Sequence, residues 1–169
     1  PRVAKEILDL GLPIFGICYG MQAMAIQLGG QVASATKREF GYAKVHIQQD
    51  NPLFKDIADH IDPQGNAYLD VWMSHGDHVT QLPDGFTTTA TTGEVVTAIE
   101  NPERGIYCVQ FHPEVSHTPQ GKEILRNFIF EICDCKGDWT PAQFIKEEID
   151  AIRETVGGSD NVICGLSGG

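Results

Sequence analysis

The fold of this chain is set by residues 13–20, which read Pro-Ile-Phe-Gly-Ile-Cys-Tyr-Gly. The run from Pro13 to Ile17 is short and apolar, which is typical of a strand buried on both faces of a parallel sheet. Residues 19–28 then carry apolar side chains at helical spacing, and Gly29-Gly30 ends that pattern. A strand, a tight turn and a helix in this order predict a βα unit of an open α/β sheet.

The middle of the chain predicts further strands. Short runs rich in Val, Ile, Thr and aromatic residues alternate there with turns containing Gly, Pro, Asn and Asp, and we expect strands at 32–37, 42–48, 67–73, 86–91, 95–100 and 105–111. Apolar periodicity predicts helices at 2–10, 118–135 and 140–156. The expected fold class is α/β: an open, mostly parallel sheet with an antiparallel extension, flanked by helices, followed by the start of a second α/β domain.

Two domains are expected. The first covers residues 1–135, and a linker after Cys135 leads into residues 136–169. In this second part a helix begins at Thr140-Pro141, the pattern of an N-cap followed by proline and of a capping box with Gln143. An apolar strand at 162–166 then opens a further βα unit. Because the chain begins with Pro1 and stops inside a turn, we expect it to be a fragment of a longer protein.

Composition excludes several classes of function. Twelve basic and 23 acidic residues among 169 give a net charge of −11, so we expect neither nucleic acid nor an anionic membrane as a partner. No apolar run approaches the roughly 20 residues of a membrane span. The five cysteines are an odd number and no secretory leader precedes them, which argues against a disulfide framework and favours a cytoplasmic protein.

Cys18 lies between two glycines at the predicted turn from strand to helix. Such a turn exposes a side chain at the carboxyl edge of the sheet, where open α/β folds bind ligands. Gly16 and Gly20 should leave room for the turn and for close packing of the helix. A helix N-terminus should also lower the pKa of the thiol, and the thiolate is a nucleophile. The alternative interpretation is a small buried apolar residue.

A possible partner for the thiol is found in residues 110–114, Gln-Phe-His-Pro-Glu, where a predicted strand runs into a loop. A cysteine that attacks an amide needs a base or acid, and that imidazole needs a third group to fix its orientation. In an extended segment His112 and Glu114 project to the same side. These two residues could therefore complete a triad with Cys18.

The motifs Gly-Ile-Cys-Tyr-Gly-Met-Gln at 16–22 and Phe-His-Pro-Glu-Val at 111–115 resemble those of the class I, or triad-type, glutamine amidotransferases, which have a flavodoxin-like fold. The resemblance implies that Cys18 attacks the side-chain amide of glutamine and forms a γ-glutamyl thioester. It implies that His112 protonates the departing ammonia and activates water, and that Glu114 orients His112. No cofactor is expected for this half-reaction.

The same resemblance assigns the substrate contacts. The backbone amide of Tyr19 would be one oxyanion donor, and the glutamine would be bound by Gln22 together with a strand-end loop formed by Ser74, His75 and Gly76. The second oxyanion donor of the family belongs to a segment upstream of Pro1. Because one missing donor typically costs about 10² to 10³ in rate, full activity is expected of the intact protein.

The end of the chain suggests the ammonia acceptor. Ser167-Gly168-Gly169 resembles the start of the ATP pyrophosphatase loop, whose backbone amides bind pyrophosphate. A triad domain, a short linker and this loop together resemble the synthases that convert xanthosine monophosphate to GMP. The resemblance implies glutamine, ATP and xanthosine monophosphate as substrates, ATP and Mg²⁺ in the synthetase part, and a homodimer.

Three alternatives stay open at this point. The domain could serve another synthase, of the anthranilate or carbamoyl-phosphate type, or it could bind glutamine without turnover. A metal site could use Cys133, Cys135 and His117, but a Cys-x-Cys pair lacks the second ligand pair of usual zinc spacing. We therefore expect no metal in this part of the protein.

Overall fold

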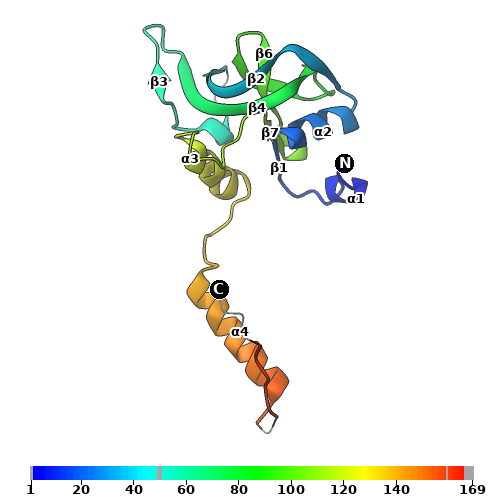
Figure 1. The fold of residues 1–169 in the computed structure, drawn as a ribbon, viewed down its shortest axis with the longest axis vertical. Helices are drawn as coiled ribbons and strands as arrows, with labels where there is room; N and C mark the ends of the chain where they lie inside the picture. The colour runs from blue at the N-terminus through cyan, green and yellow to red at the C-terminus, as the bar shows by residue number, and fades with distance from the viewer. Residues whose placement is uncertain (1, 49–50, 159, 166–169) are drawn as a thin grey trace. The chain divides into compact units, whose positions relative to one another are not determined.

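The computed structural model describes residues 2–48, 51–158 and 160–165. It divides into two compact units, Pro1–Cys135 and Lys136–Gly169 (Figure 1). The first unit contains a sheet with its covering helices, and the second contains helix α4 (Pro141–Val156). Over the described ranges, no helix combines the length and the apolar character that crossing a membrane requires.

A seven-stranded sheet forms the centre of the first unit, in the order β1-β7-β6-β5-β2-β4-β3. Its strands are β1 (Ile14–Ile17), β2 (Gln31–Ile47), β3 (His60–Ile61), β4 (Ala67–Gln81), β5 (Thr87–Thr92), β6 (Val95–Asn101) and β7 (Ile106–Val109). β1 pairs with β7 in parallel, whereas the other neighbouring pairs are antiparallel. The expected α/β sheet with flanking helices is confirmed, but the expectation of mostly parallel pairing was wrong, because among the described residues parallel pairing is confined to β1 and β7. Short connections, such as residues 93–94 between β5 and β6, can join only antiparallel neighbours.

Strand β2 replaces two predicted strands. The sequence suggested a turn near Gly41, but the chain continues through this residue with a φ of +102°, paired with Met73 of β4. Pairing shifts between Ser34 and Glu39, where residues 35–38 lie opposite Gly76 alone. The prediction of two separate strands was wrong, because a long partner strand such as β4 can keep the ladder continuous across a bulge. Local sequence does not reveal that partner strand.

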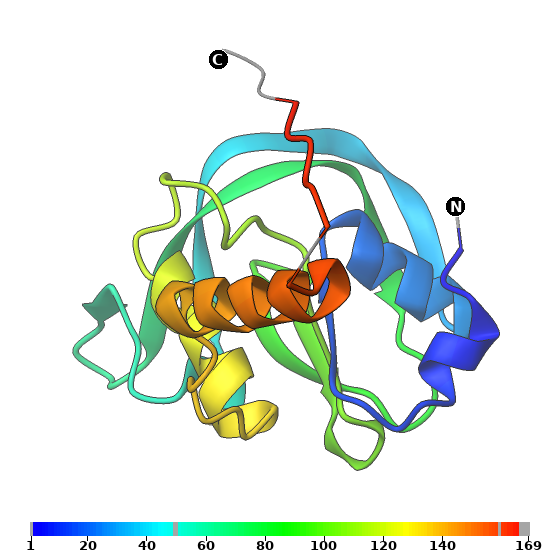
Figure 2. The same ribbon diagram turned by 90° about the horizontal axis from the view of Figure 1, so that it is seen from below.

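Helices cover both faces of the sheet. Helix α2 (Tyr19–Gln27) packs Met21, Met24 and Ala25 against one face, with Ile106 and Cys108 of β7. Tyr107 and Val109 point to the other face, where they meet Ile124 of α3 (Gly121–Asn127), η1 (Pro52–Phe54) and the π-helical turn η3 (Phe128–Ile132). Figures 1 and 2 show α2 and α3 at opposite sides of the first unit. β7 is therefore apolar throughout because both of its faces are buried.

Two helices begin or end differently from the prediction. α1 (Lys5–Leu8) is shorter than the expected 2–10, and Ile7 and Leu10, two apolar residues of the predicted helix, are 48% and 62% exposed. Short helices gain most of their stability from packing, and these two exposed apolar side chains provide little of it. α3 begins at Gly121 and not at Thr118, because residues 115–121 form hydrogen-bonded turns first. η2 (Pro102–Arg104) is a short 3₁₀ turn before β7.

The second unit confirms the predicted helix start. The hydroxyl of Thr140 accepts a hydrogen bond from the amide of Gln143 at 3.2 Å, but the Gln143 side chain donates to Glu147 instead of completing a capping box. The described residues 160–165 form no strand, so the strand expected at 162–166 is not present there. A strand needs a ladder partner, and the described part of this unit offers none. Ser167, Gly168 and Gly169 lie outside the described residues.

Candidate active site

Cys18 occupies a strained turn between β1 and α2. Its backbone has φ +51° and ψ −106°, a conformation that residues with a side chain rarely adopt. The amide of Cys18 donates to the carbonyl of Val109 at 2.8 Å, which extends the β1–β7 ladder by one step. A Cβ at Gly16 would lie 3.1 Å from the backbone carbon of Gly20 and 3.2 Å from the amide nitrogen of Met21, so this glycine allows α2 to approach the strand. A Cβ at Gly20 would meet no described atom within 4 Å, so the prediction that Gly20 is needed for close packing of the helix was wrong.

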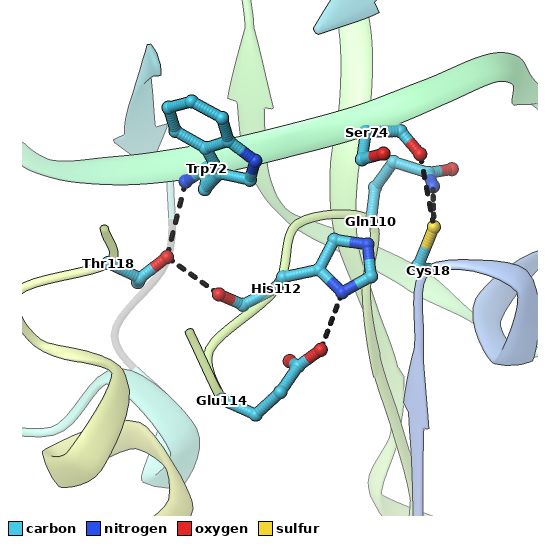
Figure 3. A network of polar contacts seen from close by, with 7 residues as sticks. All are labelled: Cys18, Trp72, Ser74, Gln110, His112, Glu114 and Thr118. Carbon is cyan, nitrogen blue, oxygen red and sulfur yellow. Dashed lines mark hydrogen bonds and ion pairs between the residues drawn. The ribbon is translucent and has the colours of Figure 1, made fainter. Parts of the chain in front are cut away.

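The sulfur of Cys18 is partly buried among polar groups. Sγ lies 3.7 Å from the carbonyl oxygen of Ser74 and 3.6 Å from the side-chain Nε2 of Gln110 (Figure 3). Burial raises the pKa of the thiol; hydrogen bonds from the Tyr19 amide and from Gln110 act in the opposite direction, and the Glu114 carboxylate raises it further. The expected lowering of this pKa was wrong, because desolvation outweighs the two donors.

His112 and Glu114 form a close pair on the loop that follows β7. Nδ1 of His112 lies 2.6 Å from Oε1 of Glu114, and the buried Pro113 connects them. A carboxylate only accepts hydrogen bonds, so Nδ1 carries the proton and Nε2 of the neutral ring has a free lone pair. Figure 3 shows Nε2 on the side of the ring that faces Cys18. No hydrogen bond joins His112 to Cys18 among the described contacts, as is common before substrate binds.

The His112 loop is fixed to the sheet by Thr118. The Thr118 hydroxyl donates to the carbonyl of His112 at 2.6 Å and accepts from the amide of Trp72 at 3.2 Å. The amide of His112 in turn donates to the carbonyl of Trp72 at 3.1 Å. The predicted helix at 118–135 would place Thr118 at its first position, whereas the Thr118 side chain instead holds the backbone of His112 (Figure 3).

Ser74, His75 and Gly76 belong to β4 and not to a strand-end loop. The error arose because the Gly76-Asp77 pair reads as a turn, whereas β2 continues the ladder past it to Gln81. Ser74 reaches the sulfur of Cys18 through its carbonyl oxygen. His75 is buried, and its Nδ1 donates to the carbonyl of Asp77 at 2.9 Å. The structure thus brings Ser74 to the thiol and turns the ring of His75 into the protein.

Gln22 and Gln110 form a buried pair beside the thiol. Nε2 of Gln22 donates both to the carbonyl of Asp77 at 2.8 Å and to Oε1 of Gln110 at 3.1 Å. Gln22 was expected to bind glutamine, but Gln110 was not predicted as a site residue. The available signal was a polar residue directly after the apolar run 106–109, which requires a buried partner.

The glutamine amidotransferase class I family model matches residues 1–132 of the chain. This match covers most of the sequence. The chain belongs to the class I glutamine amidotransferase family.

Similar proteins of this family carry a more specific name. A glutamine-hydrolysing GMP synthase of Marinobacter nauticus is 52% identical over 170 residues, and one of Alkalilimnicola ehrlichii is 53% identical over the same length. Each alignment covers 100% of this chain and 32% of the relative. The chain therefore spans about a third of the length of these curated relatives.

Solved structures share the amidotransferase fold. A protein of Thermoplasma acidophilum, described as a GMP synthase subunit, superposes with a TM-score of 0.68 at 35% identity, over 86% of this chain and 65% of that one. A glutamine amidotransferase of Thermotoga maritima superposes with a TM-score of 0.57 at 25% identity, over 89% and 57% of the two chains. No cluster of three or more His, Cys, Asp or Glu side chains suited to a metal ion occurs in the described part of this amidotransferase.

Proposed function

We propose that this chain is the glutamine-hydrolysing part of a GMP synthase, with Cys18 as nucleophile, His112 as acid and base, and Glu114 as the group that orients His112. The observation that carries this proposal is the 2.6 Å contact between His112 and Glu114 on a loop beside the strained cysteine. The identity of 52% with relatives named GMP synthase supports the choice of synthase.

In the first half of the reaction, His112 Nε2 takes the proton of the Cys18 thiol, and Sγ attacks the carbon of the glutamine side-chain amide. The new C–S bond places negative charge on the amide oxygen, to which the backbone amide of Tyr19 donates. His112 then gives its proton to the amide nitrogen. The C–N bond breaks, ammonia leaves, and a γ-glutamyl thioester remains on Cys18.

In the second half, His112 Nε2 removes a proton from water, and the hydroxide attacks the thioester carbon. The C–S bond breaks, the sulfur receives the proton from His112, and glutamate leaves. Glu114 accepts the Nδ1–H bond throughout, so it keeps one tautomer and stabilises the imidazolium. Gln22 and the Ser74–Gly76 segment would line the substrate site.

The ammonia would aminate xanthosine monophosphate. In the intact protein, ATP would adenylate the base in the presence of Mg²⁺, and ammonia would displace AMP. Ser167, Gly168 and Gly169 would begin the loop that binds ATP. We keep the second domain from residue 136 onward and the homodimer as predictions.

The test uses the intact protein and compares two nitrogen sources. Cys18→Ala should abolish GMP formation with glutamine while ammonium supports it at the wild-type rate. Cys133→Ala, at another partly exposed thiol of the same unit, is the matched control and should change neither rate. Glutamine-dependent synthesis by the Cys18→Ala variant would disprove the nucleophile, and failure of wild type to aminate xanthosine monophosphate with ammonium would disprove the synthase.

A further inference from the structure

A buried chain of side-chain amides ends at the candidate nucleophile. Gln110 is 0% exposed and Gln22 is 8% exposed, although glutamine side chains mostly remain in water. Their hydrogen bonds run from the carbonyl of Asp77 through Gln22 and Gln110 to the sulfur of Cys18. The fold therefore buries two side-chain amides, and the second of them, Gln110, donates to the thiol of Cys18.

The direction of each amide in this chain is fixed by its partners. The backbone carbonyl of Asp77 can only accept, so Gln22 must present its NH₂ group there. The same NH₂ group faces Gln110, which must answer with its oxygen. Gln110 is then left with its own NH₂ group toward Sγ of Cys18, at 3.6 Å. Reversing Gln22 would place its oxygen against two acceptors, the Asp77 carbonyl and Oε1 of Gln110. Reversing Gln110 would place two NH₂ groups against each other.

The sheet register explains why Gln110 meets Cys18. Ile17 pairs with Val109 in the parallel ladder, so Cys18 and Gln110 are the next residues along the two strands. Both continue the strand pattern through their amides, Cys18 to Val109 and Gln110 to Thr97, each at 2.8 Å. Neighbouring parallel strands place residues in register on the same face, so the two side chains meet.

We propose that Gln110 is a further catalytic residue, whose side-chain N–H stabilises the ionised sulfur of Cys18, and that Gln22 is a positioning residue that holds Gln110 in this orientation. The inference rests on the proposed glutaminase function and deepens it. The same N–H donor acts twice in that reaction: it favours the thiolate that attacks glutamine, and it stabilises the thiolate that leaves when the thioester is hydrolysed.

The other groups around the sulfur make this donor necessary. The carbonyl of Ser74 on β4 can accept from the thiol but repels a thiolate, and the Glu114 carboxylate opposes ionisation from the loop after β7. The Tyr19 amide of α2 and the Gln110 side chain favour ionisation. In the proposed mechanism His112 accepts the proton. Burial already raises the pKa of the Cys18 thiol, so the loss of one of these two donors should raise it further.

The test measures how fast iodoacetamide alkylates Cys18 in the intact protein as a function of pH, by mass spectrometry of the Cys18 peptide. Gln110→Met keeps the approximate volume but removes the donor, and it should move the profile to higher pH by about one unit, so that alkylation at pH 7 falls roughly tenfold. The kcat/KM for glutamine should fall by at least the same factor, while ammonium-dependent synthesis stays unchanged.

A second variant tests the chain of side-chain amides from Gln22 to Gln110 without replacing Gln110. Gln22→Glu replaces the donor by an acceptor, so Gln110 should reverse and turn its oxygen toward the sulfur, with an upward shift at least as large. The matched control is Gln27→Met, the same loss of a side-chain amide as in Gln110→Met but in α2 at a side chain that bonds to Val3, and it should leave the profile in place. If Gln110→Met does not fold, Gln22→Glu carries the test.

If the pH profiles of Cys18 alkylation in Gln110→Met and Gln22→Glu coincided with that of wild type, the proposed roles of Gln110 and Gln22 would be overturned. Alkylation needs no glutamine, so this result is independent of whether the protein hydrolyses it. Failure of the proposed function has a different signature: no glutamine hydrolysis by wild type, or hydrolysis that survives Cys18→Ala.

Discussion

Nδ1 of His112 lies 2.6 Å from Oε1 of Glu114, and this contact fixes which ring nitrogen can face the thiol. An amide at position 114 could donate as well as accept, so the other tautomer would become accessible. We expect Glu114→Gln to lower kcat for glutamine hydrolysis on the order of 10² to 10⁴, with ammonium-dependent synthesis retained. Glu131→Gln is the control, since Glu131 forms an exposed pair with Lys55. Equal losses in both variants would contradict an orienting role.

Thr118 should matter for both stability and rate. It is 4% exposed, and Thr118→Val keeps its shape but removes the bonds to His112 and Trp72. We expect a loss of about 1 to 3 kcal/mol in the free energy of unfolding, since the amide of Trp72 loses an acceptor. The loosened loop should also reduce kcat for glutamine on the order of tenfold. Thr118→Ser should restore both quantities in thermal unfolding and glutaminase assays, and a fully active Thr118→Val would refute the positioning role.

Gly121 permits the start of α3 to touch the triad loop. A Cβ at this position would lie 1.9 Å from the carbonyl oxygen of Pro113, far inside van der Waals contact with a backbone atom. Gly121→Ala should therefore displace Pro113 and its neighbours His112 and Glu114, and lower the melting temperature together with glutaminase activity. Gly158→Ala is the control, since Gly158 has no positive φ and a Cβ there meets no described atom within 4 Å. Equal melting temperatures for the two variants would argue against the clash.

Glu100 should make stability depend on pH. It is 8% exposed, Oε2 has no hydrogen-bond partner among the described residues, and burial raises the pKa of its carboxyl. Below the ordinary glutamate pKa both folded and unfolded states bind the proton and nothing is lost. As pH rises through the raised native pKa, the buried group must ionise and stability falls. Glu100→Gln should match wild type near pH 4 and exceed it by about 1 kcal/mol at pH 8 in urea unfolding. A constant difference across pH would contradict this assignment.

Local sequence was sufficient for the elements that depend on local physics. The apolar run before Cys18, the helix after it and the Thr140 cap follow from periodicity, glycine placement and N-cap chemistry, and the structure forms all three. The contact between His112 and Glu114 was predicted from an extended segment, and it forms although residues 113–114 lie in a turn. Nearness in the chain was sufficient to pair them.

Features that depend on distant strands could not be predicted. The register that places Gln110 and the Ser74 carbonyl against Cys18 comes from pairings across the sheet, to which no local pattern points. The continuity of β2 and the role of Thr118 also depend on distant strands. The Thr118 hydroxyl accepts a hydrogen bond from Trp72, 46 residues away in the chain. The pKa of Cys18 was misjudged because the extent of burial is a property of the whole fold.

The positive φ of Cys18 sets chemistry against thermostability at a single position. Glycine reaches this region of the Ramachandran map without the steric penalty of about 1 to 3 kcal/mol, offset in part by its larger unfolded-state entropy. Cys18→Gly should thus melt higher than Cys18→Ala, although both lack the sulfur. Directed evolution that rewards heat resistance alone would drift toward an inert enzyme here, and a library screened for robustness needs glutamine turnover as a second criterion.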